Sequence, residues 1–558
     1  MEKKYHWATT GDVNAFFGLV LDNLAGLILI VSLLSTIFQF PVEFALRHLV
    51  PGTAIGVFVG DFLYFLLAFQ LAAKTGKPVT AMPLGLDTPS IFGTAFFVLG
   101  PAFLHAKNNL GLAETEAATY AWQIGICALL VSGVFKVFCA FGSNWIHRLF
   151  PRAGLLGSLA AIALVLISFL PLLEVMHYPV VGLASTAIIL ITLIGRVPLP
   201  FKIPGTVAAL LVGGIIYYFM FAMGWLHREP MKFSAYSALM PQGWTAAWDF
   251  GWLQRMSDTL PYLPIVIPLA LGTVVGGIDC AESAAAAGDK YNTSVVIGIE
   301  AIATIAAALC GGVVQTTPYI GHPAYKAMGG RAAYTLATAL FIGAAGVLGF
   351  FGYVYEWTPI PAVYPILLFI GLEITGQSFI ATPKRHYPAV AFACVPALAL
   401  LSIHFVGQIW GDGATLAAGI NPGTLQGVAL KTNLTTAMLL SNGFLIISLL
   451  WSSCLALAID RKLHKAAICL IVAAFLTLFG VIHSPFSDAR LFLPGFGGKA
   501  WFGSSDLWLT DPKMLEQSGS FALAYIVTAA LLWGWHLYLI RSEQTELPDD
   551  LRDVGEGI

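Results

Sequence analysis

Long apolar segments recur along almost the whole chain, and they restrict what it can fold into. A segment of about 20 apolar residues can cross the hydrocarbon core of a bilayer as a helix. Two further segments, near 79–104 and 314–328, are apolar but interrupted. The sequence therefore predicts an all-α polytopic membrane protein with about 16 crossings. The uninterrupted segments lie near 14–37, 52–73, 120–142, 153–176, 181–196, 203–223, 262–287, 294–312, 332–353, 360–380, 387–406, 435–458, 465–484 and 521–540.

The composition excludes several other classes of protein. Hydrophobic residues make up 58% of the chain and charged residues 10%, and the formal net charge of -2 offers no basic surface for nucleic acid. The seven cysteines fall inside apolar segments without a CxxC pair, so neither a zinc site nor a disulfide framework is predicted. No metal or cofactor is expected. The sequence contains no HExxH or GxSxG motif, and an enzyme is not predicted.

The lysines and arginines predict an orientation, because cytoplasmic loops of membrane proteins are enriched in positive charge. With the N-terminus inside, 18 of the 28 basic residues fall in inward loops, nine fall in outward loops, and Lys136 lies within a span. The first apolar segment is long enough to span, so we expect it to be retained rather than cleaved as a signal. The expected location is the cell (inner or plasma) membrane, with both termini cytoplasmic.

The two interrupted segments predict a binding site. They read "KPVTAMPLGLDTPSIFG" and "VVQTTPYIGHPAYKAMGG", and Pro83 in the first lies 235 residues before Pro318 in the second. Each has a short run that tolerates a strand, then prolines and glycines before a helix-permissive stretch. Extended backbone at membrane depth survives only when it is buried in protein or lines a cavity. Paired interruptions in two halves favour a transporter site, although two kinked spans are the alternative.

Two carboxylates within one apolar segment are the strongest candidate site residues. Asp279 and Glu282 lie three residues apart, so they share one face of a helix. Charged side chains inside a membrane are energetically costly, so their presence indicates a function. The pair can accept N–H donors of a ligand, or carry a proton or a sodium ion; a structural pair bonded to neighbouring helices is the alternative. Ser283 and the small residues nearby let a ligand approach the helix closely.

Several other polar residues lie within apolar segments. Asp22 is in the first span of the first half, as Asp279 is in the second half, and a place at the rim of the same cavity competes with helix packing. His322 lies in the second interrupted segment, where a substrate-facing or proton-relay role is as plausible as a structural one. Asp87 is its counterpart in the first segment. For the remaining acids a structural role is favoured; these are Asp61, Glu300 and Glu373.

Three stretches resemble motifs of the nucleobase/ascorbate transporter superfamily (the xanthine/uracil permeases), most of all its adenine/guanine/hypoxanthine permease branch. They are "TAMPLGLDTPS", "GGIDCAES" and "TTPYIGHPAYKAMGGR". The resemblance covers about residues 10–460. It implies two inverted repeats of seven spans, with short strands in spans 3 and 10, and a carboxylate of span 8 against the substrate, which matches Asp279 with Glu282 and Ser283 on the same face.

The resemblance also implies a division into core and gate domains. The core comprises spans 1–4 and 8–11, and the gate comprises the other six of the fourteen. About two additional C-terminal spans exceed the fourteen of the family. The expected boundaries are 1–142 and 260–353 for the two halves of the core, 153–223 and 360–458 for the two halves of the gate, 465–540 for the additional spans and 541–558 for a cytoplasmic tail.

The second interrupted segment departs from the family. The family often has an acid two residues after the position of Tyr319, where this chain has Gly321 followed by His322. A purine-type acceptor is therefore missing on one side, and Glu282 is a candidate replacement. The substrate stays open for this reason.

The sequence favours a secondary active transporter that moves a small polar solute, a nucleobase or related heterocycle, coupled to protons or sodium by an elevator-type movement. The alternatives are an anion transporter of the sulfate or bicarbonate type with the same fold, and a non-coupled channel or sensor. The expected partners are a small-molecule substrate, a coupling cation (H+ or Na+) and the lipid bilayer. A homodimer is left open. The expected binding residues are Asp279, Glu282, Ser283, Asp87, Tyr319, Gly321 and His322, and those for ion coupling are Asp279, Glu282 and Asp22.

Overall fold

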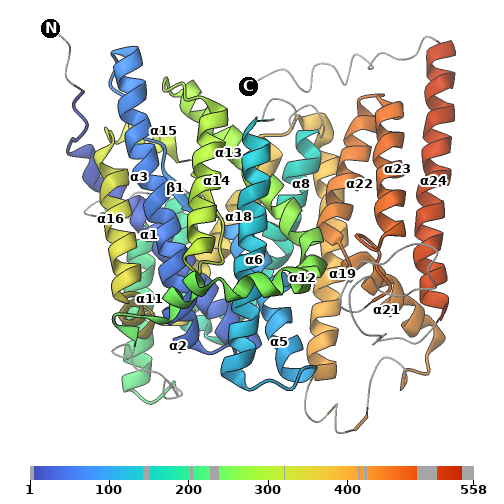
Figure 1. Ribbon diagram of the computed structural model, residues 1–558, viewed down its shortest axis with the longest axis horizontal. Helices are drawn as coiled ribbons and strands as arrows, with labels where there is room; N and C mark the ends of the chain where they lie inside the picture. Colours follow the sequence, from blue (N-terminus) through green and yellow to red (C-terminus); the bar gives the residue numbers. More distant parts are fainter. Residues whose placement is uncertain are drawn as a thin grey trace. The chain divides into compact units, whose positions relative to one another are not determined.

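The computed structural model is built almost entirely of apolar helices, as the sequence predicts (Figure 1). Within the part of the chain that it describes, ten helices are long and apolar enough to cross a membrane, or up to 12 if each of two bent pairs counts as one span, and three shorter apolar helices accompany them. The described residues are 5–141, 151–195, 197, 199–200, 205–226, 238–319, 321–411, 415, 418–419, 424–486 and 512–542.

The chain divides into two compact units. Unit 1 comprises residues 1–146 and 172–367, and unit 2 comprises residues 147–171 and 368–558. The chain passes between them within α9 (Phe169–His177) and α18 (Ile360–Ile380). The other elements of unit 1 are α1 (Gly11–Phe38), α2 (Val42–Phe44), α3 (Val50–Thr75), β1 (Leu84–Leu86), α4 (Thr88–Thr94), α5 (Gly100–Asn108), α6 (Glu114–Phe141), α10 (Pro179–Ile189), α11 (Gly205–Ala222), α12 (Met256–Thr259), α13 (Leu263–Ala286), α14 (Thr293–Leu309), β2 (Thr316–Pro318), α15 (His322–Ala327), α16 (Ala333–Leu348) and α17 (Phe351–Trp357).

Unit 2 contains the two additional C-terminal helices that the sequence predicts. Its described elements are α8 (Arg152–Ile162), α19 (Tyr387–Gly411), α21 (Val428–Ser441), α22 (Phe444–Ile459), α23 (Leu463–Leu478) and α24 (Pro512–Arg541). Figure 1 shows α22, α23 and α24 side by side, and a shared apolar core joins them. His483 accepts or donates a hydrogen bond at Tyr525 on α24 over 2.8 Å, and Trp451 on α22 donates to the same hydroxyl over 2.9 Å. Buried polar bonds therefore fix α24 to this unit.

The order of elements repeats. In each half two helices precede a short strand and a helix that follows it, and four further spans come after. The two strands pair antiparallel, with Leu84 opposite Pro318 and Leu86 opposite Thr316. Both strands lie in the interrupted segments, so the predicted fold class is confirmed: an all-α polytopic protein with one short strand in each half. The core and gate boundaries stay predictions, and the expected tail beyond residue 542 lies outside the described residues.

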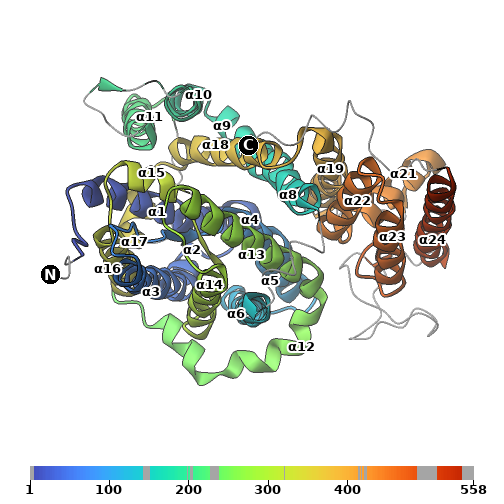
Figure 2. The same cartoon turned by 90° about the horizontal axis from the view of Figure 1, so that it is seen from above.

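Helices enclose the strands on all the sides that the structure describes. The strand β1 packs against α1 and α3, and β2 packs against α13 and α14. Seen from above, α3 lies between α14 and α16 and packs against both (Figure 2). Each strand is three residues long, and a proline, which lacks an N–H donor, stands at one end of each: Pro83 just before β1 and Pro318 at the end of β2. This enclosure satisfies the rule that extended backbone in a membrane must be buried in protein.

Two predicted spans are bent rather than straight. The segment predicted at 332–353 becomes α16 and α17, which meet at 84°, and the segment at 435–458 becomes α21 and α22, which meet at 81°. Gly349 stands at the first break with a φ of 82°, and Gly443 at the second with a φ of 76°. Both values lie in the left-handed region that favours glycine, so a glycine allows each sharp turn.

Candidate functional site

A buried acid supports the backbone of strand β1. The Oδ1 atom of Asp61, on α3, accepts a hydrogen bond from the Leu84 N–H over 3.0 Å, and the Asp61 side chain is completely buried. The Asn23 side chain on α1 donates to the Leu84 carbonyl over 3.3 Å. The strand backbone is thus held from two helices. The structural role favoured for Asp61 agrees with this geometry.

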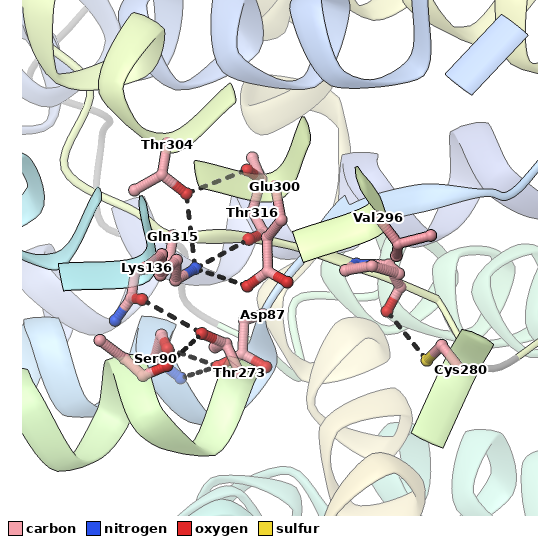
Figure 3. Close-up of polar contacts among 12 residues, drawn as sticks. Asp87, Ser90, Lys136, Thr273, Cys280, Val296, Glu300, Thr304, Gln315 and Thr316 are labelled. Atoms are coloured by element: carbon pink, nitrogen blue, oxygen red, sulfur yellow. Dashed lines mark hydrogen bonds and ion pairs between the residues drawn. The ribbon is translucent and has the colours of Figure 1, made fainter. Parts of the chain in front are cut away.

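A buried ion pair supports strand β2 at the matching place. The Lys136 ammonium on α6 lies 2.8 Å from Glu300 Oε1 on α14, and both side chains are 0% exposed. The same ammonium donates to the Thr316 carbonyl of β2 over 3.1 Å and to Thr304 Oγ1 over 3.4 Å (Figure 3). Glu300 corresponds to Asp61 in the repeated order of elements, since each lies on the long helix that precedes the strand of its half, α14 and α3. In this half, however, a lysine stands between the acid and the strand.

Asp87, a predicted binding residue, caps the helix that follows β1. Its Oδ2 accepts a hydrogen bond from the Ser90 N–H over 2.8 Å and a second, short one from the Ser90 hydroxyl. The Asp87 N–H donates to the Gln315 carbonyl over 3.0 Å, which extends the pairing of the strands. An N-cap carboxylate satisfies the free N–H groups of the first turn and carries negative charge. The Asp87 carboxylate therefore already occupies the start of α4, where an anion from solution would otherwise bind.

Two other predicted residues meet near the end of β2. The Tyr319 hydroxyl forms a side-chain hydrogen bond with the carboxylate of Asp22 on α1. Tyr319 is 38% exposed, in contrast to the buried residues around it. A Cβ at Gly321 would lie 2.6 Å from the Tyr319 ring, so the glycine makes room for that ring. The position where the family often has an acid thus holds a residue that lets an aromatic side chain lie beside Asp22.

Helix α13 carries the remaining predicted residues along the strands. Cys280 Sγ donates a weak hydrogen bond to the Pro318 carbonyl over 3.3 Å, which fixes this helix against β2. Its neighbour Asp279 is partly exposed, as is Ser283, while Glu282 is exposed. A Cβ at Gly276 would meet no atom within 4 Å. This part of α13 therefore offers a carboxylate next to open space.

Three carboxylates from different elements lie within electrostatic range of Cys280. Asp279, Glu300 and Asp87 all lie close enough to act electrostatically on its thiol. Lys136 acts in the same way on Glu300 and Asp87. The acids that the sequence scatters over 213 positions, from Asp87 to Glu300, therefore gather around the paired strands, with a lysine among them.

The His322 side chain, at the start of α15, is buried rather than at an open surface. Its side chain is 0% exposed, and Nε2 lies 3.1 Å from the Thr80 carbonyl and 3.3 Å from Asp289 Oδ2. Asp289, in the turn between α13 and α14, also accepts from the Thr80 N–H over 3.1 Å and pairs with Lys326 over 2.7 Å. These bonds join the start of the first interrupted segment to α15. A substrate-facing or proton-relay role for His322 stays a prediction.

Replacing Asp289 by asparagine is expected to lower the stability of the protein. Burial alone would raise the pKa of Asp289, but the hydrogen bonds from His322, Lys326 and the Thr80 N–H outweigh burial and hold the pKa below its ordinary value. Hydrogen bonds to charged groups contribute about 1.5–3 kcal/mol. A depressed pKa in the folded state gives stability that is present above the ordinary aspartate pKa and is lost as the pH falls through the folded-state value.

The measurement is thermal unfolding of the purified protein in detergent from neutral to acidic pH. The gap in melting temperature between the wild type and Asp289→Asn should be full at neutral pH and should close only in strong acid. Asp249→Asn is the matched control, because Asp249 is exposed and the same charge is removed. A gap that stays constant down to the acid limit would contradict this account.

Residues that sequence reasoning did not assign to the site also shape it. The sequence shows Lys136 as a charge within a span. Its partner Glu300 is far along the chain, so the spacing of the residues could not predict their ion pair. Asn23, next to Asp22, is buried and bonded to β1. Gln315 lies beside Thr273 of α13, with Thr273 Oγ1 donating to its Oε1 over 3.4 Å. Only contacts across the fold reveal these three.

A cavity of about 810 Å³ opens near the C-terminal end of α1, far along that helix from its start at Gly11. It is large enough for a small-molecule ligand. Among the described residues its lining holds three glutamates and one lysine, Lys107. The glutamates are Glu43, Glu114 and Glu174, and five tyrosines join them: Tyr178, Tyr217, Tyr218, Tyr355 and Tyr364. This lining favours cationic or neutral hydrogen-bonding solutes over anions.

Comparisons with known proteins give structural likeness and no close relative. No protein-family profile and no curated protein sequence matches the chain. The transmembrane domain of the cyanobacterial bicarbonate transporter BicA is similar, with a TM-score of 0.48, 13% identity, and coverage of 71% of this chain and 96% of that one. A structure of SLC26A9 gives a TM-score of 0.45 at 12% identity, covering 69% and 61%. The murine anion transporter Slc26a9 in its inward-facing state gives 0.37 at 10%, covering 73% and 69%.

Proposed function

We propose that this chain is a secondary active transporter that moves a small polar solute across a membrane, and that the solute is a nucleobase or related heterocycle. The observation that carries the proposal is the antiparallel pair β1–β2, held by buried acids inside a set of apolar helices. Irregular backbone at membrane depth is typical of transporter sites formed between two repeats. The helix α13, with Asp279 next to open space, forms one wall of that site.

The charges of the site support a hydrogen-bond donor as the substrate. Asp279 and Glu282 on α13, and Asp22 beside Tyr319, are acceptors, and a nucleobase presents ring and exocyclic N–H groups to such acceptors. The Tyr319 ring adds a partly exposed aromatic surface on which a planar heterocycle can stack. None of these residues lines the cavity with three glutamates and five tyrosines, but that separate cavity also offers acceptors to such a solute.

The same carboxylates support coupling to a cation. A proton or a sodium ion on Asp279, Glu282 or Asp22 would neutralise a negative charge that is costly to expose to the membrane interior. Binding of the cation would then make the site fit for a neutral solute. Movement of a core domain against a gate domain, in the elevator manner, remains the mechanism that the family resemblance implies.

Anion transport of the sulfate or bicarbonate type is the second candidate. The observation that favours it is the start of α15, where Gly321 offers no side-chain cap, since helix N-termini favour anions. Against it, Asp87 caps α4, and Glu300 already neutralises Lys136. A channel or sensor without coupling is the third candidate, and uphill accumulation in vesicles would exclude it.

Uptake of a labelled purine into proteoliposomes tests the proposal. We expect uptake to be competed by unlabelled nucleobases and to be unaffected by the same concentration of sulfate or bicarbonate. The acceptors of the site are carboxylates, which repel anions. Vesicles containing no protein provide the background. Competition by sulfate or bicarbonate without competition by nucleobases would support the anion candidate instead.

A further inference from the structure

The surroundings of the Lys136 ammonium have the composition of an alkali-metal site. Three oxygen atoms of different kinds converge on Nζ: carboxylate Oε1 of Glu300 at 2.8 Å, the carbonyl oxygen of Thr316 at 3.1 Å and hydroxyl Oγ1 of Thr304 at 3.4 Å. Thr304 and Thr316 also lie within 3.3 Å of each other through their hydroxyls. Carboxylate, hydroxyl and the carbonyls of unwound backbone are the ligands that transporters offer to sodium. Figure 3 shows Nζ at the point where these oxygens meet.

The neighbouring residues are shaped around this arrangement. A Cβ at Gly277 on α13 would lie 2.7 Å from Glu300 Oε2, so a larger residue there would displace the carboxylate. Glu300 and Lys136 are both completely buried, and a buried charge without a partner is strongly destabilising. The pair is therefore neutral as a unit, and its positive member is covalently attached to α6.

We propose that Lys136 is a tethered cation that occupies an oxygen cage otherwise suited to a sodium ion. A tethered ammonium cannot leave with the substrate, so this place does not carry the coupling ion. The inference rests on the proposed function only for its consequence for transport: coupling then uses a proton or a sodium ion at the other carboxylates, Asp279, Glu282 or Asp22.

Removing the lysine should turn the cage into a sodium site. In Lys136→Met, Glu300 loses its positively charged partner. The Glu300 carboxylate, the Thr304 hydroxyl and the Thr316 carbonyl are then free to bind a cation from solution. We expect NaCl to raise the melting temperature of purified Lys136→Met above that in N-methylglucamine chloride. For a ligand at roughly ten times its Kd the rise in a chain of this length is about 1 °C. The rise should be larger in Lys136→Met than in the wild type, in which the Lys136 ammonium fills this site and any sodium effect comes from the other carboxylates.

Two further variants make the test decisive. In Lys136→Met/Glu300→Gln the sodium-specific rise should disappear, because the cage has lost its negative charge. Lys136→Ser, which is smaller and polar, is a second cage-opening variant with the same expected rise, for use if Lys136→Met does not fold. If neither opened variant shows a larger sodium-specific rise than the wild type, the proposal is overturned.

The melting experiment is independent of transport, so its outcome separates two failures. If no purine is taken up but the opened variants gain a sodium-specific rise, the proposed substrate is wrong and the tethered cation stands. If purine uptake succeeds but neither opened variant gains a sodium-specific rise beyond that of the wild type, the transporter stands and the tethered cation is overturned.

Discussion

Uptake by the Asp279→Asn variant is expected to fall to the background of vesicles that contain no protein, while the variant still inserts into the membrane. Asparagine keeps the size of the side chain but removes the negative charge that accepts a substrate N–H or holds the coupling cation. Loss of a hydrogen bond to a charged group, worth about 1.5–3 kcal/mol, lowers binding by roughly 10- to 150-fold. Initial rates of labelled purine uptake, normalised to the amount of inserted protein, provide the measurement.

Glu373→Gln is the matched control for Asp279→Asn. Glu373 is an acid on an apolar helix too, but its side chain is exposed and accepts a hydrogen bond only from the nearby Gln377, among the contacts that the structure describes. The same loss of charge at this place should leave uptake at the wild-type rate. Full uptake by Asp279→Asn would remove Asp279 from the site. Equal losses in both variants would indicate a general effect of lost charge.

The second large effect is on stability. In a buffer without sodium, Lys136→Met is expected to lose about 3–5 kcal/mol, because Glu300 is then left buried without its partner. Glu300→Gln should also be destabilised, since it leaves the Lys136 ammonium buried without a charged partner. The double variant Lys136→Met/Glu300→Gln buries no charge and should lose much less than the sum of the two, with a coupling energy of about 1–3 kcal/mol. Chemical unfolding of the purified variants in detergent measures all three.

The matched control is the exposed ion pair of Arg47 with Glu43, whose atoms are 3.1 Å apart and whose side chains are about 40% exposed. Solvent screens such a pair, and its removal should cost at most about 1 kcal/mol. Additive losses in the Lys136 and Glu300 variants would show that the two residues do not act as a pair. The unfolding of these variants measures how strongly Lys136 and Glu300 interact in the wild type. The melting experiment in NaCl tests whether a sodium ion takes the place of the ammonium when Lys136 is removed.

Local features of the sequence predicted the fold well. The apolar segments correspond to helices, and the runs "PLGLD" and "TTPY" lie where β1 and β2 form. Proline and glycine act through the backbone of their own neighbourhood, so their effect is visible in the sequence. The bends at Gly349 and Gly443 were not predicted, because apolar length alone does not distinguish a straight span from two helices joined at a glycine.

Contacts between distant segments were harder to predict. Asp61, Glu300 and Lys136 are three isolated charges in the sequence, and their roles depend on which strand each one faces. His322 was singled out by its place in an interrupted segment, yet its bonds to Asp289 and Thr80 arise from a turn and a segment that sequence spacing does not bring near it. Whether Asp279, Glu282 and Ser283 bind substrate stays a prediction.

The pairing of β1 with β2 has a consequence for biosynthesis. Leu86 pairs with Thr316, about 230 residues later, so the first strand has no partner until the first two spans of the second half and β2 have left the ribosome. Unpaired strand backbone is costly in lipid. The strand of the first half must therefore be shielded by neighbouring helices or by insertion machinery until then, and the proposed binding site is assembled only after insertion of the second half has begun.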